Sequence, residues 1–460
     1  MVFDLSIRPV VHRAPRLYLG LFKQWNKFQE AHPVHTGSRS RSQLQCLPRY
    51  SLSAMPTKRR TSSNPNDTTS ANGISHASKR GRVDLTQPHP NSQQAEDFGI
   101  ILRDFYPPEM SNERCEAYNN GTLERPIEAL QKCYEETMDA RQAIRPSNAV
   151  VHWFKSDLRL HDNRALYMAY EIARDNKIPL ICLYILSPED LTAHLTSAAR
   201  VDLTLRTLAQ LKQDLGELDI PLYMEVQEKR KGIPSRILDL CQRWGANHLF
   251  ANIEYEVDEL RRDTTLVRQC VENGIKFEAA HDTCVVTPGA LSSQQGKQYA
   301  VYSPWYRAWL ACLKENPEYL EVVQEPGSNP GDARKHFGDL FDSQVPAPPA
   351  NKQLSEEEKG HLRGLYPAGE HEALHRLEGF LEKKAKSYDD MRNLPAGQHT
   401  SVLSPYFASG ALSARTAVSM ARHANGNQLD RKEPGYVSWI SEVAWRDFYR
   451  HVLVHWPFIW

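Results

Sequence analysis

Long apolar runs, an excess of one charge and paired cysteines are all missing from this sequence of 460 residues. No stretch approaches the roughly 18 consecutive apolar residues of a membrane-spanning helix, so we expect no membrane partner. Lysine plus arginine equals aspartate plus glutamate at 56 each, so any surface for nucleic acid must be a local patch. The eight cysteines form no CxxC pair and have no histidine at ligand spacing, which predicts no metal site and a reducing compartment.

The first 97 residues have the composition of targeting signals rather than of a folded domain. Residues 1–54 carry eight lysines and arginines against two acidic residues, which is typical of a mitochondrial transit peptide. A disordered tail or a misassigned start codon remains an alternative. Met55 opens a second possible start, and the basic clusters 58–60 and 79–82 resemble a bipartite nuclear signal, although such runs are often only solvated tails. We expect a disordered targeting region that directs the protein to the nucleus and the mitochondrion.

After a helical lead-in at 98–146, short apolar runs alternate with helical patterns. The apolar runs are 149–154, 179–186, 221–226 and 248–252, and the helical stretches between them are 165–174, 198–217 and 237–244. This alternation predicts an α/β domain with a doubly wound parallel sheet, which binds ligands at the carboxyl ends of its strands. No GxGxxG motif or P-loop lysine motif occurs, so a nicotinamide or ATP site has no support.

A dense polar loop, KSDLRLHDN, follows the first predicted strand. By itself it is explained as a helix-capping network with Asp162 or Asn163 as the cap. With the strand end it reads WFKSDLRLHDN at 153–163, which is similar to the W-F-R-x-D-L-R-L-x-D-N signature of the photolyase/cryptochrome family, with Lys155 in place of arginine. The resemblance continues through 254–259 and 302–305 and covers residues 147–460. Within the family, the sequence is most like a class I cyclobutane pyrimidine dimer DNA photolyase of fungal type.

The resemblance implies an order of domains. It predicts a doubly wound, Rossmann-like antenna-chromophore domain at 147–285, an interdomain connection at 286–351 with a Pro/Gly-rich stretch, and an all-helical FAD-binding domain from 352. The family's helical domain continues well past the point that corresponds to Trp460. We therefore expect the sequence to be C-terminally truncated, its helical domain incomplete, and these 460 residues alone to be unstable or inactive as a repair enzyme.

The α/β domain of this family holds a light-harvesting pigment, and the resemblance implies 5,10-methenyltetrahydrofolate here. Its contacts carry over to His194, Asp258 and Glu259, although folate-binding members often have asparagine where this sequence has Asp258. Carboxylates can accept hydrogen bonds from the ring nitrogens and exocyclic amine of a pterin. The alternative is an exposed, salt-bridged helix start. That alternative involves Glu254, Glu256, Asp258, Glu259, Arg261 and Arg262.

Residues 399–410 offer hydroxyls and backbone amides at a predicted helix entry, with Ser404 as N-cap and Pro405 at the first helical position. Such a turn is either an ordinary capped helix start or a cradle for phosphate. The stretch is similar to the family's T-S-x-L-S-P-Y motif, which implies contacts with the diphosphate of FAD. The implied contacts are Thr400, Ser401, Leu403 and Ser404, with Tyr388 nearby.

The last predicted helix, 437–454, has two contrasting sides. At 100° per residue, one side carries Trp439, Glu442, Arg446 and Arg450, flanked by Trp445 and Tyr449. The opposite side carries Val437, Ile440, Ala444 and Phe448. The polar side either faces solvent or lines a site. The stretch 439–451 is similar to the W-x-x-E-x-x-W-R-E-F-Y-R-H motif of dimer photolyases, and this favours the site.

The resemblance also implies roles on this helix. Trp445 would stack on a pyrimidine dimer flipped out of DNA, and Glu442 would hydrogen-bond the base edge, while Trp439 and Arg446 would contact the flavin. The implied function is blue-light-driven repair of cyclobutane dimers in DNA by a monomeric FAD enzyme, a deoxyribodipyrimidine photo-lyase. Two alternatives stay open: a cryptochrome-type photoreceptor, disfavoured by Trp445 and Tyr449, and an inactive fragment that binds only a chromophore.

Overall fold

The computed structural model describes residues 112–457 except 294–295, 297 and 395–396. The described residues lie within one unit of the chain, Ser70–Trp460. The targeting signals expected in residues 1–97, and Phe458 and Trp460, fall outside the described residues. None of the helices in the described part is both long enough and apolar enough to cross a membrane.

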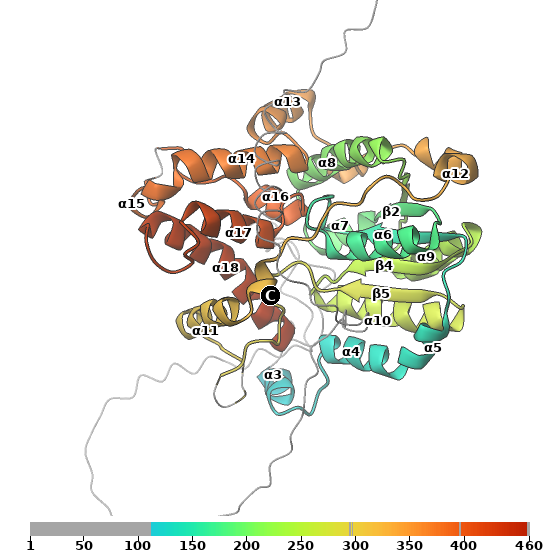
Figure 1. Ribbon diagram of the computed structural model, residues 1–460, viewed down its shortest axis with the longest axis horizontal. Coiled ribbons are helices and arrows are strands. Elements are labelled where there is room, and N and C mark those ends of the chain that lie inside the picture. The colour runs from blue at the N-terminus through green and yellow to red at the C-terminus, as the bar shows by residue number, and fades with distance from the viewer. Residues whose placement is uncertain (1–111, 294–295, 297, 395–396, 458–460) are drawn as a thin grey trace, which may run out of the picture. The chain divides into compact units, whose positions relative to one another are not determined.

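A five-stranded parallel sheet in the order β3-β2-β1-β4-β5 forms the centre of the α/β part (Figure 1). Its strands are β1 (Ala149–Phe154), β2 (Leu180–Leu186), β3 (Leu222–Val226), β4 (Ala246–Asn252) and β5 (Lys276–Ala280). Every residue of β1 and β2 is buried, as expected for parallel strands covered on both faces. The four predicted strands are confirmed. β5 was not predicted, because its sequence KFEAA is short and has little apolar character.

Helices connect the strands and cover the sheet. They are α6 (Arg164–Asn176), α7 (Pro188–Ala193), α8 (Ala198–Glu217), α9 (Ile233–Arg243) and α10 (Val257–Glu272). α6 and α8 share an apolar cluster with Val150 and Phe154 of β1. The chain winds from β1 outward to β3 and then returns to β4 on the other side of β1. The strand order therefore reverses between β1 and β4, where doubly wound sheets open a crevice for ligands.

A helical lead-in precedes the sheet and contacts the last helix of the chain. It comprises α3 (Asn112–Asn119), α4 (Pro126–Glu136) and α5 (Met138–Ala143). The Arg125 side chain donates from Nε to the carbonyl of His455 at 2.9 Å and from Nη2 to the carbonyl of Tyr118 at 2.7 Å. The carbonyls at a helix C-terminus lack intrahelical partners, so Arg125 satisfies one of them across 330 residues of sequence.

Among the residues that the structure describes after β5, the regular elements are helices joined by loops. The α-helices are α11 (Tyr302–Glu315), α12 (Ala333–Phe341), α13 (Glu356–Leu365), α14 (Glu370–Lys383), α15 (Tyr388–Met391), α16 (Ser404–Ser409), α17 (Ala414–Ala424) and α18 (Pro434–His455). Short 3₁₀ turns occur at Pro317–Leu320, Ala350–Lys352 and Ala385–Ser387. The stretch 286–351, predicted as a connection, contains α11 and α12. Trp305 and Trp309 of α11 are fully buried in one apolar cluster with residues of α14, α17 and α18.

The polar loop after β1 joins the α/β part to the helical part. Asn163 is the N-cap of α6, its Oδ1 accepting from the amide of Leu166 at 3.1 Å, so one of the two predicted caps is confirmed. Asp162 adopts a left-handed backbone with φ 58° and accepts hydrogen bonds from Ser413 Oγ and Thr416 Oγ1 of the helical part. Its carboxylate also accepts from Arg415 Nε at 2.8 Å.

Arg415 is fully buried and extends this junction into a charge network. Its Nη2 donates to Asp282 Oδ1 at 2.9 Å, and Asp282 also pairs with Arg159 of the loop. Gly410, with φ 74°, allows close approach nearby, since a Cβ there would lie 2.0 Å from the carbonyl oxygen of Ser156. The signature loop is therefore largely a structural junction.

Candidate functional site

A cavity of about 290 Å³ lies at the carboxyl ends of β1, β2 and β4. It is lined by Trp153 of β1, by Lys155 just after β1, by Ser187 after β2 and by Glu254 after β4. Ala408 and Ser409 of α16 line it from the helical part. The cavity lies at the strand ends where a doubly wound sheet binds ligands, and its size suits a small organic ring system.

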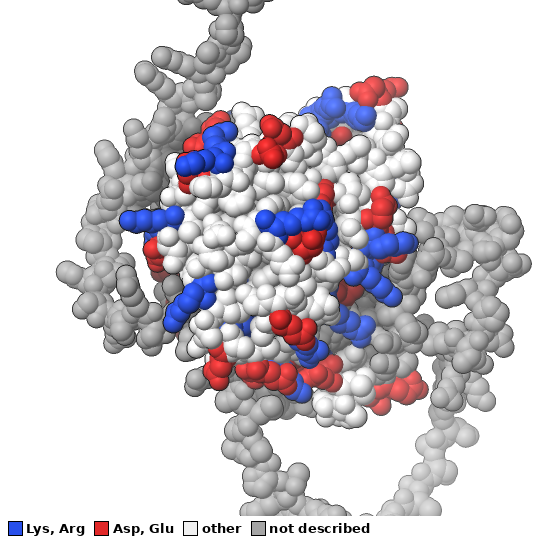
Figure 2. Space-filling view, turned by 90° about the vertical axis from the view of Figure 1, so that its right-hand side faces the viewer, with Lys and Arg blue, Asp and Glu red and all other residues white. Residues whose placement is uncertain are grey.

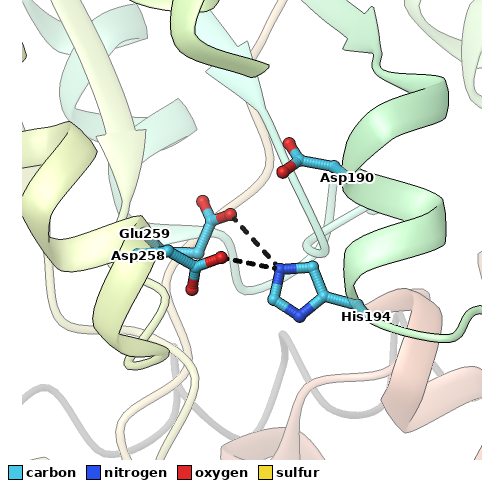
Figure 3. Close-up of side chains that lie close together, drawn as sticks. All are labelled: Asp190, His194, Asp258 and Glu259. Atoms are coloured by element: carbon cyan, nitrogen blue, oxygen red, sulfur yellow. Dashed lines mark ion pairs between the residues drawn. The ribbon is translucent and has the colours of Figure 1, made fainter. Parts of the chain in front are cut away.

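The three predicted antenna residues lie together beside this cavity (Figure 3). His194, at the end of α7, has its Nε2 3.1 Å from Asp258 Oδ2 and 4.0 Å from Glu259 Oε1 at the start of α10. His194 and Glu259 line the cavity, and Glu259 is only 6% exposed. Burial lowers the pKa of His194 below its ordinary value. Asp258 is close by but is not among the lining residues.

Arginines already pair with the carboxylates of this cluster. Arg230 pairs with Asp258 and, through Nε at 2.9 Å, with Asp190 Oδ1. Arg262 pairs with Glu259, and its Nη1 lies 3.1 Å from Asp190 Oδ2. A possible ligand atom from each of Asp190, His194, Asp258 and Glu259 lies within 4.8 Å of the others, which is close enough for a metal site. The arginines offset the negative charge that would attract a cation, so the cluster suits an organic ligand with hydrogen-bond donors better.

Sequence reasoning missed several charged residues of the cavity wall, among them Lys155 and Glu254. Lys155 Nζ donates to both oxygens of Asp263, at 2.9 and 2.8 Å, in a buried pair. Glu254 Oε1 accepts from the amide of Ser156 at 3.2 Å. Burial alone would raise the pKa of Glu254, but Lys155, Ser156 and Arg262 bring it below its ordinary value. Lys155 belongs to the family signature at 153–163, and Glu254 belongs to the group expected to form a salt-bridged helix start. Their spacing of 99 residues in sequence gave no sign that they share a cavity.

On α18, Glu442 lies toward α15. It pairs with Arg392, and burial raises the pKa of nearby Tyr388, with Glu442 adding to the rise. Tyr388 is buried with its ring edge against Phe380, at 5.6 Å between centroids. The structure thus brings Tyr388 close to Glu442, which the sequence did not indicate, and shows Arg392 as the partner of the carboxylate.

Trp445 is half-buried within a group of aromatic rings. Its ring lies 3.5 Å from that of Tyr302, with the planes 10° apart. Phe448 meets it edge-on at 5.6 Å, and Tyr449 lies 5.6 Å away and is 47% exposed. The predicted flank of Trp445 and Tyr449 is therefore formed, and α11 supplies a ring that the sequence did not place there.

Arg446 and Trp439 differ in their surroundings. Arg446 donates from Nη1 to the carbonyl of Thr283 and lies 5.9 Å from the ring centroid of Phe407 on α16. Burial lowers the pKa of Arg446 to about 10. Trp439, which the helical pattern placed on the polar side, is buried against Phe380 at 5.3 Å. Trp439 is covered because α14 and α15 pack on part of the side predicted as polar, while Glu442 on the same side stays exposed.

The predicted phosphate segment lies just before and within α16. Thr400 and Ser404 are exposed, Ser401 is half-buried and Leu403 is buried in the helical core. The prediction of Ser404 as N-cap is wrong: Leu403 holds that position without a side-chain cap, so Ser404 is the first helical residue and Pro405 the second. Val402, with φ 55°, turns the backbone sharply before the helix and shifts the entry by one residue.

Two buried polar residues of the 439–451 motif were missed. Asp447 Oδ2 accepts from the amide of Val285 at 2.8 Å and from Trp309 Nε1 at 3.3 Å. His451 Nε2 lies 2.9 Å from the carbonyl oxygen of Val286. Both residues attach α18 to the segment after β5. The helical pattern could not reveal this, because Asp447 and His451 lie on the side that it assigned to the apolar core.

Comparison with known proteins was made against families, curated proteins and solved structures. The DNA photolyase family model matches residues 150–325. A deoxyribodipyrimidine photo-lyase of Neurospora crassa is 50% identical over 423 residues, which cover 88% of this chain and 69% of that protein. The mitochondrial deoxyribodipyrimidine photo-lyase of Saccharomyces cerevisiae is 28% identical, covering 83% of this chain and 69% of that protein. The Escherichia coli protein of the same name is 30% identical over 66% of this chain and 60% of its own length.

Two solved structures share the fold. A bacterial class III photolyase from Agrobacterium tumefaciens matches with a TM-score of 0.52 at 24% identity, over 68% of this chain and 60% of that chain. A Synechocystis cryptochrome matches with a TM-score of 0.54 at 20% identity, over 67% of this chain and 61% of that chain. Both confirm an α/β part followed by a helical part. With half of its aligned residues identical to the Neurospora protein, this chain belongs to the DNA photolyase family.

Proposed function

We propose that this protein repairs cyclobutane pyrimidine dimers in DNA with blue light, using FAD. The observation that carries the proposal is the arrangement on α18, where the half-buried Trp445 lies beside Glu442 and the desolvated Arg446. A stable apolar adduct offers little to acid or base catalysis. An aromatic platform with one carboxylate and one cation therefore suits electron-driven cleavage better than hydrolysis.

The residues present fit FAD. The hydroxyls of Thr400 and Ser404 are exposed and neither caps α16, which leaves them available to a diphosphate. Arg446 of α18 lies beside Phe407 of α16, so its planar guanidinium is placed to bind the same ligand. We assign the diphosphate to Thr400, Ser401, Leu403 and Ser404, with Tyr388 nearby, and the flavin side to Trp439 and Arg446. When bound, FAD supplies the light-driven electron that opens the dimer.

The chain's own residues bind and orient the dimer. Trp445 stacks on the flipped dinucleotide, whose poor stacking in the duplex lowers the cost of extrusion. Glu442 accepts a hydrogen bond from the base edge, and its ion pair with Arg392 fixes the carboxylate before DNA arrives. Charges of both signs are interspersed over the face seen in Figure 2, so that face is not a one-sign surface for DNA. Binding depends on local phosphate contacts around the dimer site.

The test compares the parent protein, in the full form made in its cells, with Trp445→Ala. Photorepair and DNA binding are measured for both proteins. Base stacking on an aromatic ring is worth about 1–3 kcal/mol per base, so we expect the preference for dimer-containing DNA to fall about 10-fold or more, and photorepair with it. Binding to undamaged DNA, which rests on phosphate contacts, is the internal control. Full dimer preference in Trp445→Ala would contradict the stacking role.

The cavity beside α7 and α10 takes 5,10-methenyltetrahydrofolate as antenna in this proposal. The buried carboxylate of Glu259 accepts from the pterin's donors, and His194 contributes a second polar contact. The domain limits 147–285 for the antenna part, 286–351 for the connection and the helical part from 352 belong to the proposal as well. In the same proposal, the protein is a monomer and is located in the nucleus and the mitochondrion.

Glu259→Gln is expected to weaken folate binding about 10- to 100-fold, because a hydrogen bond to a buried charged group contributes about 1.5–3 kcal/mol. The measurement is titration with 5,10-methenyltetrahydrofolate followed by its near-ultraviolet absorbance. Glu272→Gln, an exposed change at the far end of α10, is the matched control. Equal affinity in the two variants would argue that folate binds elsewhere.

A further inference from the structure

The ring of Tyr302 covers one face of Trp445. The two ring centroids are 3.5 Å apart and the planes differ by 10°, which is direct parallel contact. Tyr302 is the first residue of α11, a helix of the stretch between the α/β part and the rest of the helical part. At this distance no base can enter between the two rings. One face of the indole is therefore closed by the protein itself.

Hydrogen bonds hold Tyr302 in this place. Its hydroxyl donates to the carbonyl of Ser441 at 2.8 Å and lies 2.7 Å from Ser441 Oγ. A tyrosine hydroxyl has one proton to donate and can accept another, so both contacts can form at once. Ser441 precedes Trp445 by one helical turn on α18. Tyr302 therefore contacts both ends of the helical turn from Ser441 to Trp445. Because Ser441 and Trp445 belong to the same helix, the hydrogen bonds to Ser441 hold the Tyr302 ring in a fixed position against Trp445.

Further rings support Tyr302 from behind. Tyr306, one turn further along α11, stacks on it at 5.4 Å with the planes 13° apart. Trp305 lies 5.9 Å away and is fully buried in the helical core. A row of aromatic rings therefore connects Trp445 to the core, and this limits the positions that the indole can adopt.

We propose that Tyr302 is a positioning residue that fixes the indole of Trp445 and reserves its opposite face for the pyrimidine dimer. The inference rests on the proposed function. A platform that is ordered before binding loses less rotational freedom when the dimer stacks on it, so Tyr302 strengthens dimer binding without touching the dimer. Tyr449, 47% exposed, is the neighbouring ring that can move when the dimer enters.

The experiment compares Tyr302→Leu, Tyr302→Phe and Tyr319→Leu in the protein as its cells make it. Tyr319 is a half-buried tyrosine at the edge of the same apolar cluster, and it is not among the described rings that contact Trp445. The probes are an oligothymidylate with one cyclobutane dimer and the same strand undamaged. The measured quantity is the preference for the dimer, which is the dissociation constant of the undamaged strand divided by that of the strand with the dimer.

Tyr302→Leu is expected to lower this ratio about 3- to 10-fold, the range for one lost aromatic pair. Tyr302→Phe keeps the stacked ring and loses only the contacts of the hydroxyl with Ser441, so it is expected to lower the ratio less than Tyr302→Leu does. Tyr319→Leu is expected to reduce thermal stability without changing the ratio. In proteins labelled with 5-fluorotryptophan, the resonance missing from Trp445→Phe identifies Trp445, and Tyr302→Leu should shift and broaden it.

The outcomes separate this inference from the proposed function. A parent protein that prefers the dimer, together with equal ratios for Tyr302→Leu and Tyr319→Leu, would overturn the positioning role and leave the function standing. An unchanged Trp445 resonance in Tyr302→Leu would also overturn it. A parent that binds both strands equally would instead refute the proposed function, and this inference with it.

Discussion

Arg415→Ala is expected to lower the free energy of unfolding by about 3–5 kcal/mol, the cost of removing one partner of a buried ion pair. Arg415 is fully buried and donates to both Asp162 and Asp282. Without it, both carboxylates stay buried with Arg159 and Arg164 as the nearby cations. Burial opposes ionisation of Asp282, and Arg159 and Arg415 together hold its pKa below the ordinary value. The loss of stability of the variant relative to the parent should therefore be larger at neutral pH, where both carboxylates are ionised, than at acidic pH.

Urea denaturation monitored by tryptophan fluorescence measures this effect. Arg243→Ala, which breaks the exposed pair with Asp239, is the matched control and should cost less than about 1 kcal/mol. Thr416→Val removes a single hydrogen bond to Asp162 and should cost about 1–3 kcal/mol, which keeps the test informative if Arg415→Ala does not fold. Equal urea midpoints for Arg415→Ala and Arg243→Ala would show that the junction does not stabilise the fold.

Acid is expected to destabilise the protein strongly between pH 6.5 and about 4. Burial lowers the pKa of His152 to about 3, and the pKa of four other histidines is lowered to about 4. Those four are His248, His281, His451 and His455. In this window the unfolded chain binds protons that the folded protein excludes, so stability is complete above pH 6.5 and is lost as the pH falls. Each histidine contributes up to about 1.4 kcal/mol per pH unit.

Groups whose pKa is raised in the folded protein oppose this trend, among them His161, His371 and several buried carboxyl groups. Burial raises the pKa of Glu370 to about 7 and that of Asp447 to about 6, so the folded protein takes up these protons before the unfolded chain does. Their contribution grows as the pH falls from 7 toward the ordinary carboxyl range. The five histidines with strongly lowered pKa values outnumber Glu370 and Asp447, and the net effect of acid is destabilising. Urea denaturation at pH 7.5, 6.5 and 5.5 measures it, and equal stability at the three values would contradict it.

His152 gives this prediction a residue-level test. Its ring is fully buried in β1, and neither ring nitrogen has a hydrogen-bond partner among the residues that the structure describes. His152→Leu removes two unsatisfied polar atoms and should be neutral or stabilising at pH 7. The same variant should lose less stability on going to pH 5.5 than the parent does. The exposed His375→Leu is the control, and a parallel pH profile for His152→Leu would assign the acid effect to other groups.

The outline of the α/β part was predictable because its signals are local. The apolar run at 149–154 coincides with β1, and the pattern at 198–217 coincides with α8, since burial on both faces of a parallel strand and on one face of a helix leaves a direct mark in sequence. β5 and α11 were missed. β5 has two charged residues among five, and α11 lies beside a Pro/Gly-rich stretch that suggested only a connection.

Sequence by itself determined the family, the order of the sheet and helical parts, and the residues that share α18. Motif spacing and periodicity are sufficient for these, because they depend on neighbours within one element. Only the tertiary structure decided which distant residues meet. It pairs Glu442 with Arg392 and Asp162 with Arg415, and it places Tyr302 on the face of Trp445. Such contacts depend on how elements pack that lie 50 to 253 residues apart in sequence, and burial then strengthens them by removing water from the charges and rings involved.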